Sequence, residues 1–98
     1  MVTYRLVYAD KKVERDFLKT LLPLPANERK LILEKLGSLA LNPRPQQFKM
    51  LARPVLVYGY LAPCRLRVAD YRILYDIDDL AKKVVILSLR RRSEKTYK

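Results

Sequence analysis

Apolar and polar side chains alternate in two short runs within residues 65–77, and the pair Ala69-Asp70 separates the runs. Strict alternation is typical of a strand with one buried face, and a two-residue break between such runs predicts a β-hairpin. With that pair as the turn, Arg67 lies directly opposite Arg72. The sequence therefore predicts an antiparallel hairpin at 65–77.

The two faces of this hairpin differ in chemistry, because successive side chains of a strand point to opposite sides. One face is apolar and carries Leu66, Val68, Tyr71 and Ile73. The other face carries Arg65, Arg67 and Arg72. Like charges directly opposite each other on a ladder are unfavourable, by ~0.2–1 kcal/mol per pair. Three guanidinium groups on one sheet face therefore suggest a binding site for a polyanion.

The first half of the chain predicts a strand and two helices. Residues 2–9 alternate and form the strand, and Asp10 after them is a suitable N-cap. An apolar stripe within 13–22 predicts a helix that the following prolines end, since proline lacks the N–H that a helix interior needs. A second helix is expected from about 26 to 41.

The second half predicts further strands. Lys49 to Leu51 is expected to begin a short strand, and 55–61 is β-rich, with Gly59 indicating a bulge. The continuous apolar run 84–89 predicts a strand buried on both faces. The expected fold class is α+β: an N-terminal strand, a helical hairpin, and an antiparallel sheet of three to four strands.

The composition adds a strong positive charge to this picture. The 98 residues suit one domain spanning 1–98, and 50% hydrophobic residues are enough for a packed core. Lys and Arg number 21 against 10 Asp and Glu, which gives a formal net charge of +11. This asymmetry favours nucleic acid or an acidic protein as the partner. We expect residues 90–98 to form a basic C-terminal tail.

Several classes of chemistry are disfavoured. Cys64 is the one cysteine and histidine is absent, so we expect no intramolecular disulfide, no Cys/His metal site and no cofactor. A catalytic thiol without a histidine partner is also disfavoured. No apolar run approaches the ~20 residues that span a bilayer, and the first residues lack the pattern of a signal peptide. The sequence predicts a cytoplasmic protein.

The motif R-L-R-V-A-D-Y-R-I-L-Y-D-I-D-D at 65–79 resembles the core motif of RelE-like toxins in the RelE/ParE toxin–antitoxin superfamily. N-P-R-P after the second helix and the closing R-R-R-S-E-K-T-Y follow in the family's order, so the resemblance covers nearly the whole chain. It implies a small cytoplasmic endoribonuclease (an mRNA interferase) that cuts mRNA in the ribosomal A site. It also implies a cognate antitoxin partner that is small, partly acidic and DNA-binding.

The resemblance also implies which residues act. The catalytic positions of the family fall at Arg65, Arg67, Arg72, Arg91 and Tyr97. Further RNA contacts are expected from Lys49, Arg90, Arg92 and Lys95. In this mechanism the 2′-hydroxyl attacks the phosphate, which needs a proton acceptor, charge stabilisation and a proton donor. The products are a 2′,3′-cyclic phosphate and a 5′-hydroxyl.

The sequence departs from the family at the basic pair and at the turn. Family members carry lysines in the pair, whereas arginine does not usefully deprotonate in a protein. Arg65 and Arg67 are therefore expected to clamp phosphate, and Tyr97 is the nearest candidate for the general base. Ala69 replaces the usual glycine of the turn, at a mild conformational cost if its φ is positive.

Two other functions remain open. A ParE-like toxin of the same fold inhibits DNA gyrase without RNA chemistry, and a small nucleic-acid-binding module would bind its anion without cleaving it. The basic cluster together with a tyrosine near the end of the chain favours the nuclease over the gyrase inhibitor.

Individual residues also have alternative roles. The basic pair would protect an edge strand from aggregation or bind an acidic antitoxin. Arg72 would form a structural ion pair with Asp76 or Asp78. Tyr58 and Tyr60 would pack under the helices or stack on bases, and the arginines at 90–92 would be part of a solvated tail.

Overall fold

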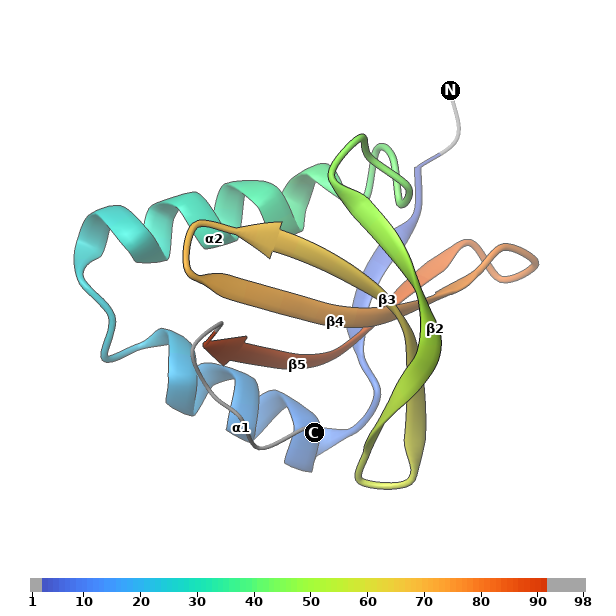
Figure 1. The fold of residues 1–98 in the computed structure, drawn as a ribbon, viewed down its shortest axis with the longest axis horizontal. Helices are drawn as coiled ribbons and strands as arrows, with labels where there is room; N and C mark the ends of the chain where they lie inside the picture. The colour runs from blue at the N-terminus through green and yellow to red at the C-terminus, as the bar shows by residue number, and fades with distance from the viewer. Residues whose placement is uncertain (1–2, 92–98) are drawn as a thin grey trace.

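A computed structural model describes residues 3–91 of the chain. Its elements in order are β1 (Arg5–Tyr8), α1 (Lys11–Leu21), α2 (Ala26–Ser38), β2 (Phe48–Val57), β3 (Tyr60–Val68), β4 (Tyr71–Asp78) and β5 (Lys83–Arg91). The strands form one sheet in the order β1-β5-β4-β3-β2 (Figure 1). The predicted α+β fold of a strand, a helical hairpin and a sheet is confirmed, with five strands in that sheet.

The two helices begin and end for identifiable reasons. Asp10 caps α1, because its carboxylate accepts a hydrogen bond from the backbone N–H of Val13 at 2.9 Å. α2 ends at Ser38, before the predicted residue 41. The next turn tightens, since the backbone N–H groups of Leu39, Ala40 and Leu41 each bond a carbonyl three residues back at 3.1 Å.

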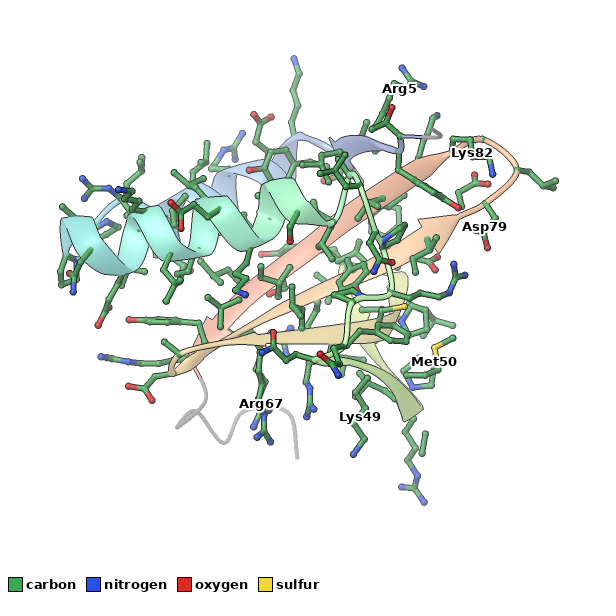
Figure 2. All side chains as sticks on the ribbon, turned by 90° about the horizontal axis from the view of Figure 1, so that it is seen from above. Arg5, Lys49, Met50, Arg67, Asp79 and Lys82 are labelled. Atoms are coloured by element: carbon green, nitrogen blue, oxygen red, sulfur yellow. The ribbon has the colours of Figure 1, made fainter. Side chains whose placement is uncertain are left out.

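Both helices pack on one face of the sheet, and Figure 2 shows them on the side opposite to the labelled Lys49 and Arg67. Apolar side chains spaced by four residues give α1 its buried stripe. The main core joins these helices to the sheet and includes Phe17, Leu21, Ile32, Leu36, Leu39, Leu66, Ile73, Tyr75, Val84 and Ile86. The sheet therefore has a face covered by the helices and an opposite face, called here the open face.

The register of the central hairpin is as the sequence predicts. Val68 pairs with Tyr71 and Arg67 with Arg72, which leaves Ala69 and the next residue as the turn. Ala69 has a φ of +53°. This position therefore carries the conformational cost expected for alanine in place of glycine.

The prediction of separate strands near 49–51 and 55–61 is wrong. β2 runs continuously from Phe48 to Val57, and the chain then reverses at Tyr58-Gly59 into β3. Both turn residues have positive φ, +49° and +86°, as the two-residue turns of twisted hairpins require. Gly59 therefore marks a turn, and the irregularity of register falls between Met50 and Val55.

β5 lies inside the sheet, antiparallel to β4 and parallel to β1. Its side chains contribute to buried clusters on both faces: Val84 and Ile86 join the main core, and Leu87 packs with Val57 and Leu74 in a second, smaller core. Burial on both faces, expected for this apolar run, is confirmed at these positions. β5 continues to Arg91, so the first two residues of the predicted tail belong to the strand.

A buried hydrogen bond ties the sheet to the loop before β2. The hydroxyl of Tyr75, whose side chain is fully buried, donates to the backbone carbonyl of Pro43 at 2.7 Å. Tyr75→Phe keeps the ring but leaves this carbonyl without its donor, so we expect a loss of about 1–3 kcal/mol in the free energy of unfolding. Urea denaturation measures it, and an unchanged midpoint would show that the bond contributes nothing to stability.

A polar network joins the residue before β1, the loop before β2 and the turn between β4 and β5. The Asp79 carboxylate accepts from the Arg44 guanidinium at 2.8 Å and from the Tyr4 hydroxyl at 2.6 Å (Asp79 is labelled in Figure 2). These two hydrogen bonds, that of Arg44 first, lower the pKa of Asp79 to about 2. The folded state therefore favours the charged carboxylate.

This lowered pKa makes the network sensitive to acid. The stabilisation is fully present above the unfolded pKa of about 4, and it is lost as the pH falls towards the folded value. We expect Asp79→Asn to melt below the parent at pH 6 and to approach it between pH 4 and pH 2. Thermal melts across this range test the expectation, and a difference that persists unchanged at pH 2 would contradict it.

Candidate anion-binding site on the open sheet face

Two rows of aligned residues gather basic side chains on the open face. Arg67, Arg72 and Arg90 are aligned across β3, β4 and β5. Lys49 and Arg65 are aligned across β2 and β3 in the adjacent row. We call these five residues the cationic cluster. Neighbouring strands lie about 4.8 Å apart, so three aligned arginines span roughly 10 Å at the backbone.

The second row is completed by Leu74 and Ser88, which continue from Arg65 across β4 and β5. Leu74 is buried in the smaller core, so this position of the row is apolar. The seven positions of the two rows hold five cations and no carboxylate, imidazole or phenol. The two rows therefore form a positively charged surface that suits the binding of phosphate groups.

A β-bulge positions Arg90 in this cluster. Tyr75 pairs with Ile86, whereas Leu74 pairs with Ser88, so Leu87 is an extra residue in β5. An inserted residue shifts every later side chain of its strand by one position. Because of this shift, Arg90 lies opposite Arg72 on the open face.

The same shift turns Arg91 towards the helix side of the sheet. Arg91 pairs with Tyr71, and its guanidinium carbon lies 5.9 Å from the centre of the Tyr71 ring. The Tyr71 hydroxyl in turn donates to Glu28 of α2 at 3.1 Å. Arg91, predicted to be catalytic, is thus not gathered with the cationic cluster in this structure, and its catalytic role remains a prediction.

The cluster combines fixed and projecting side chains. Arg65 and Arg72 are partly buried, and their Nε atoms are shielded from solvent. Arg90 is also partly buried, and its Nε donates to the Ser88 hydroxyl at 3.1 Å. Lys49 and Arg67 are exposed and project away from the helices (Figure 2). A ligand on this face would meet three partly buried arginines together with the exposed side chains of Lys49 and Arg67.

A groove of about 1040 Å³ adjoins the cluster and shares Arg90 with it. It lies between α1, the end of the β2–β3 hairpin and β5, and its lining includes Lys19, Arg53, Val55, Tyr58 and Leu87. The basic residues Lys19 and Arg53 were missed by the sequence analysis. Reading β2 as one continuous strand would have placed Arg53 on it, but no local signal brings α1 to this hairpin.

The end of the β2–β3 hairpin is attached to α1 by two tyrosines. The Tyr58 hydroxyl donates to Asp16, and the Tyr60 hydroxyl donates to Asp10 at 2.9 Å. These hydrogen bonds are the first cause of the raised pKa of each phenol. Tyr58 is 53% exposed and Tyr60 is 37% exposed, so the alternative in which these tyrosines pack beneath the helices is wrong.

Three of the predicted site residues, Arg92, Lys95 and Tyr97, lie outside the described residues 3–91. Their assigned roles remain predictions. Within the described part of the chain, no helix is long and apolar enough to cross a membrane.

Comparisons with known proteins give no match to a family model or to a curated protein. Solved structures do match over nearly the whole chain. A chain of the archaeal RelE–RelB complex from Pyrococcus horikoshii is 26% identical with a TM-score of 0.69, over 95% of this chain and 99% of that one. A chain of the RelBE2 toxin–antitoxin complex from Mycobacterium tuberculosis is 29% identical with a TM-score of 0.67, over 96% and 97%.

A mutant of the E. coli toxin RelE in its free state has the same fold. It is 19% identical with a TM-score of 0.60, over 98% of this chain and 90% of that one. The protein therefore has a RelE-like toxin fold. Its structural homologues are RelE toxins of toxin–antitoxin systems.

Proposed function

We propose that this protein is the toxin of a type II toxin–antitoxin system and cleaves mRNA in the ribosomal A site. The observation that carries the proposal is the cationic cluster, five basic side chains on the open face of a RelE-like sheet. Its charge and position suit a phosphodiester backbone laid across β2 to β5. The net charge of +11 favours encounter with the RNA-rich ribosome.

The arrangement of arginines suits phosphoryl-group chemistry. When the 2′-hydroxyl attacks, negative charge grows on the oxygens of a pentavalent phosphate, and fixed cations stabilise that charge. Guanidinium groups bind two such oxygens at once, and they remain charged throughout. Arg72, in the middle of its row, is the residue assigned to the developing charge, while Arg65 and Arg67 hold the flanking phosphates.

A cognate antitoxin is the second partner in this proposal. Two of the matching structures are complexes of a toxin with an antitoxin, which supports such a partner here. We propose that its binding segment is acidic and apolar, because acidic side chains would mask the cationic cluster. Exposed apolar side chains such as Leu56 and Leu61 would offer apolar contacts. In this scheme both proteins act in the cytoplasm.

The proposal is tested by adding the protein to a translation extract and mapping mRNA ends by primer extension. We expect cuts in phase with codons when ribosomes are present and intact mRNA when they are removed. The chain should also stop growth when expressed alone and be tolerated with its antitoxin. Intact mRNA together with stalled gyrase complexes would identify a gyrase inhibitor, and harmless expression alone would argue against any toxin.

A further inference from the structure

The cationic cluster contains one residue that differs chemically from the other four. Four of its members are arginines, whose guanidinium groups stay protonated in proteins, and Lys49 is the fifth. A lysine amine can accept a proton when it is neutral, and lysine serves as a general base in enzymes for this reason. The proposed reaction needs such an acceptor, since the 2′-hydroxyl must lose its proton as it attacks.

The aligned rows offer no alternative acceptor among side chains. Besides the five cations they hold Leu74 and Ser88, and the Ser88 hydroxyl already accepts a hydrogen bond from Arg90. Histidine is absent from the whole sequence. The nearest carboxylate along β4 on this face is that of Asp76, which accepts from the backbone N–H of Ile77 at 2.8 Å.

The position of Lys49 suits a group that acts beside a bound phosphate. It pairs directly with Arg65, and residues directly opposite each other on antiparallel strands have Cα atoms about 4.5–5.5 Å apart. The side chain is exposed and projects from the same side of the sheet as Arg67 (Figure 2). A phosphate held by Arg65 and Arg67 therefore lies within reach of the flexible Lys49 side chain.

We propose that the Nζ atom of Lys49 is the general base of the reaction, an inference that rests on the proposed function. The neutral amine takes the proton of the 2′-hydroxyl, and the O2′–P bond forms while the P–O5′ bond breaks. The departing O5′ takes a proton from solvent water, and the hydroxide left behind is neutralised by the lysine ammonium. The products are a 2′,3′-cyclic phosphate and a 5′-hydroxyl, so atoms and charge balance.

The role of Lys49 can be tested by substitutions that leave the charge of the cluster unchanged. Lys49→Arg keeps the positive charge but cannot accept a proton, so single-turnover cleavage on the ribosome should fall by about 10²–10⁴-fold. Ribosome binding should stay within about twofold of the parent, because the charge that attracts phosphate is retained. Lys30→Arg, on the exposed surface of α2, is the matched control and should cleave like the parent.

A double variant separates proton transfer from a purely structural role. Lys49→Arg/Arg65→Lys exchanges the two side chains across the ladder and returns one amine to the same row. We expect the double variant to cleave at least about tenfold faster than Lys49→Arg. If Lys49 only contacts phosphate, Lys49→Arg and the double variant should both cleave at nearly the parental rate, as Lys30→Arg does. That result would overturn the proposal. Asp76→Asn tests the competing carboxylate, and a large loss there with an active Lys49→Arg would assign the base to Asp76.

Cleavage by the parent protein separates the role of Lys49 from the function itself. If the parent protein does not cut mRNA on the ribosome, the function itself is wrong. If the parent cuts and Lys49→Arg cuts equally well, the function stands and the proton acceptor lies elsewhere, with Tyr97 as the remaining sequence-based candidate.

Discussion

Arg72→Ala should slow mRNA cleavage on the ribosome by on the order of 10²–10³-fold, the usual cost of losing one fixed group that stabilises transition-state charge. Arg72 lies in the middle of the row formed by Arg67, Arg72 and Arg90, where two guanidinium groups flank it. Its side chain is on the open face, outside the helix–sheet core, so truncation removes no core packing. Rapid-quench measurement of single-turnover cleavage gives the rate of the chemical step.

The matching control is Arg15→Ala, which removes the same charge from the exposed surface of α1. This variant lowers the net charge by the same amount as Arg72→Ala. It should still cleave at the parental rate, because the cationic cluster is intact. Circular dichroism should give Arg72→Ala a melting temperature close to that of the parent. An unfolded Arg72→Ala would instead assign this arginine a structural role, and full activity in a folded variant would remove it from the site.

The turn and register of the central hairpin could be predicted because their signals are local. The two alternating runs and the intervening pair fix both the turn and the register, and Ala69 adopts the positive φ considered for that position. A register slip by one residue would turn Leu66 and Ile73 to the open face and the arginines to the core. Hydrophobic burial therefore determines which face carries Arg67 and Arg72.

The β2–β3 connection was misread because its turn lies inside a strongly β-forming segment. V-L-V-Y-G-Y-L contains one glycine and no polar turn residue, so the pattern favours an uninterrupted strand with a bulge. The chain turns at Tyr58-Gly59 with the help of contacts distant in sequence, because the hydroxyl of Tyr58 bonds Asp16 of α1 and that of Tyr60 bonds Asp10, the N-cap of α1. No local pattern encodes those contacts.

The bulge at Leu87 is the feature that sequence reasoning was least able to predict. Without it, the pairing of Asp78 with Lys83 would continue so that Leu89 lay opposite Arg72, and Arg90 would face the helices. The bulge exchanges these faces and brings Arg90 into the cluster. An apolar run such as 84–89 looks the same with or without the extra residue, so the choice between Arg90 and Arg91 depends on the folded sheet.

The cluster should also make RNA binding depend steeply on salt. A protein that neutralises Z phosphates of a single strand releases counterions, and the logarithm of its affinity falls with the logarithm of salt concentration with a slope of about −0.7Z. If the five cations of the cluster each contact one phosphate, the slope is about −3.5. Between 50 and 200 mM salt, the affinity for a short single-stranded RNA should then fall by about 10²-fold.

Fluorescence anisotropy with a labelled RNA measures this slope, and Arg67→Ala tests its origin. Arg67 is exposed and projects from the open face (Figure 2), so its truncation should remove one phosphate contact and reduce the slope by about 0.7. Arg15→Ala on α1 should leave the slope unchanged, because its charge lies outside the contact surface. A slope near zero for the parent would mean that the cluster does not bind the backbone of RNA. An equal reduction by both variants would mean that net charge, and not this sheet face, attracts the RNA.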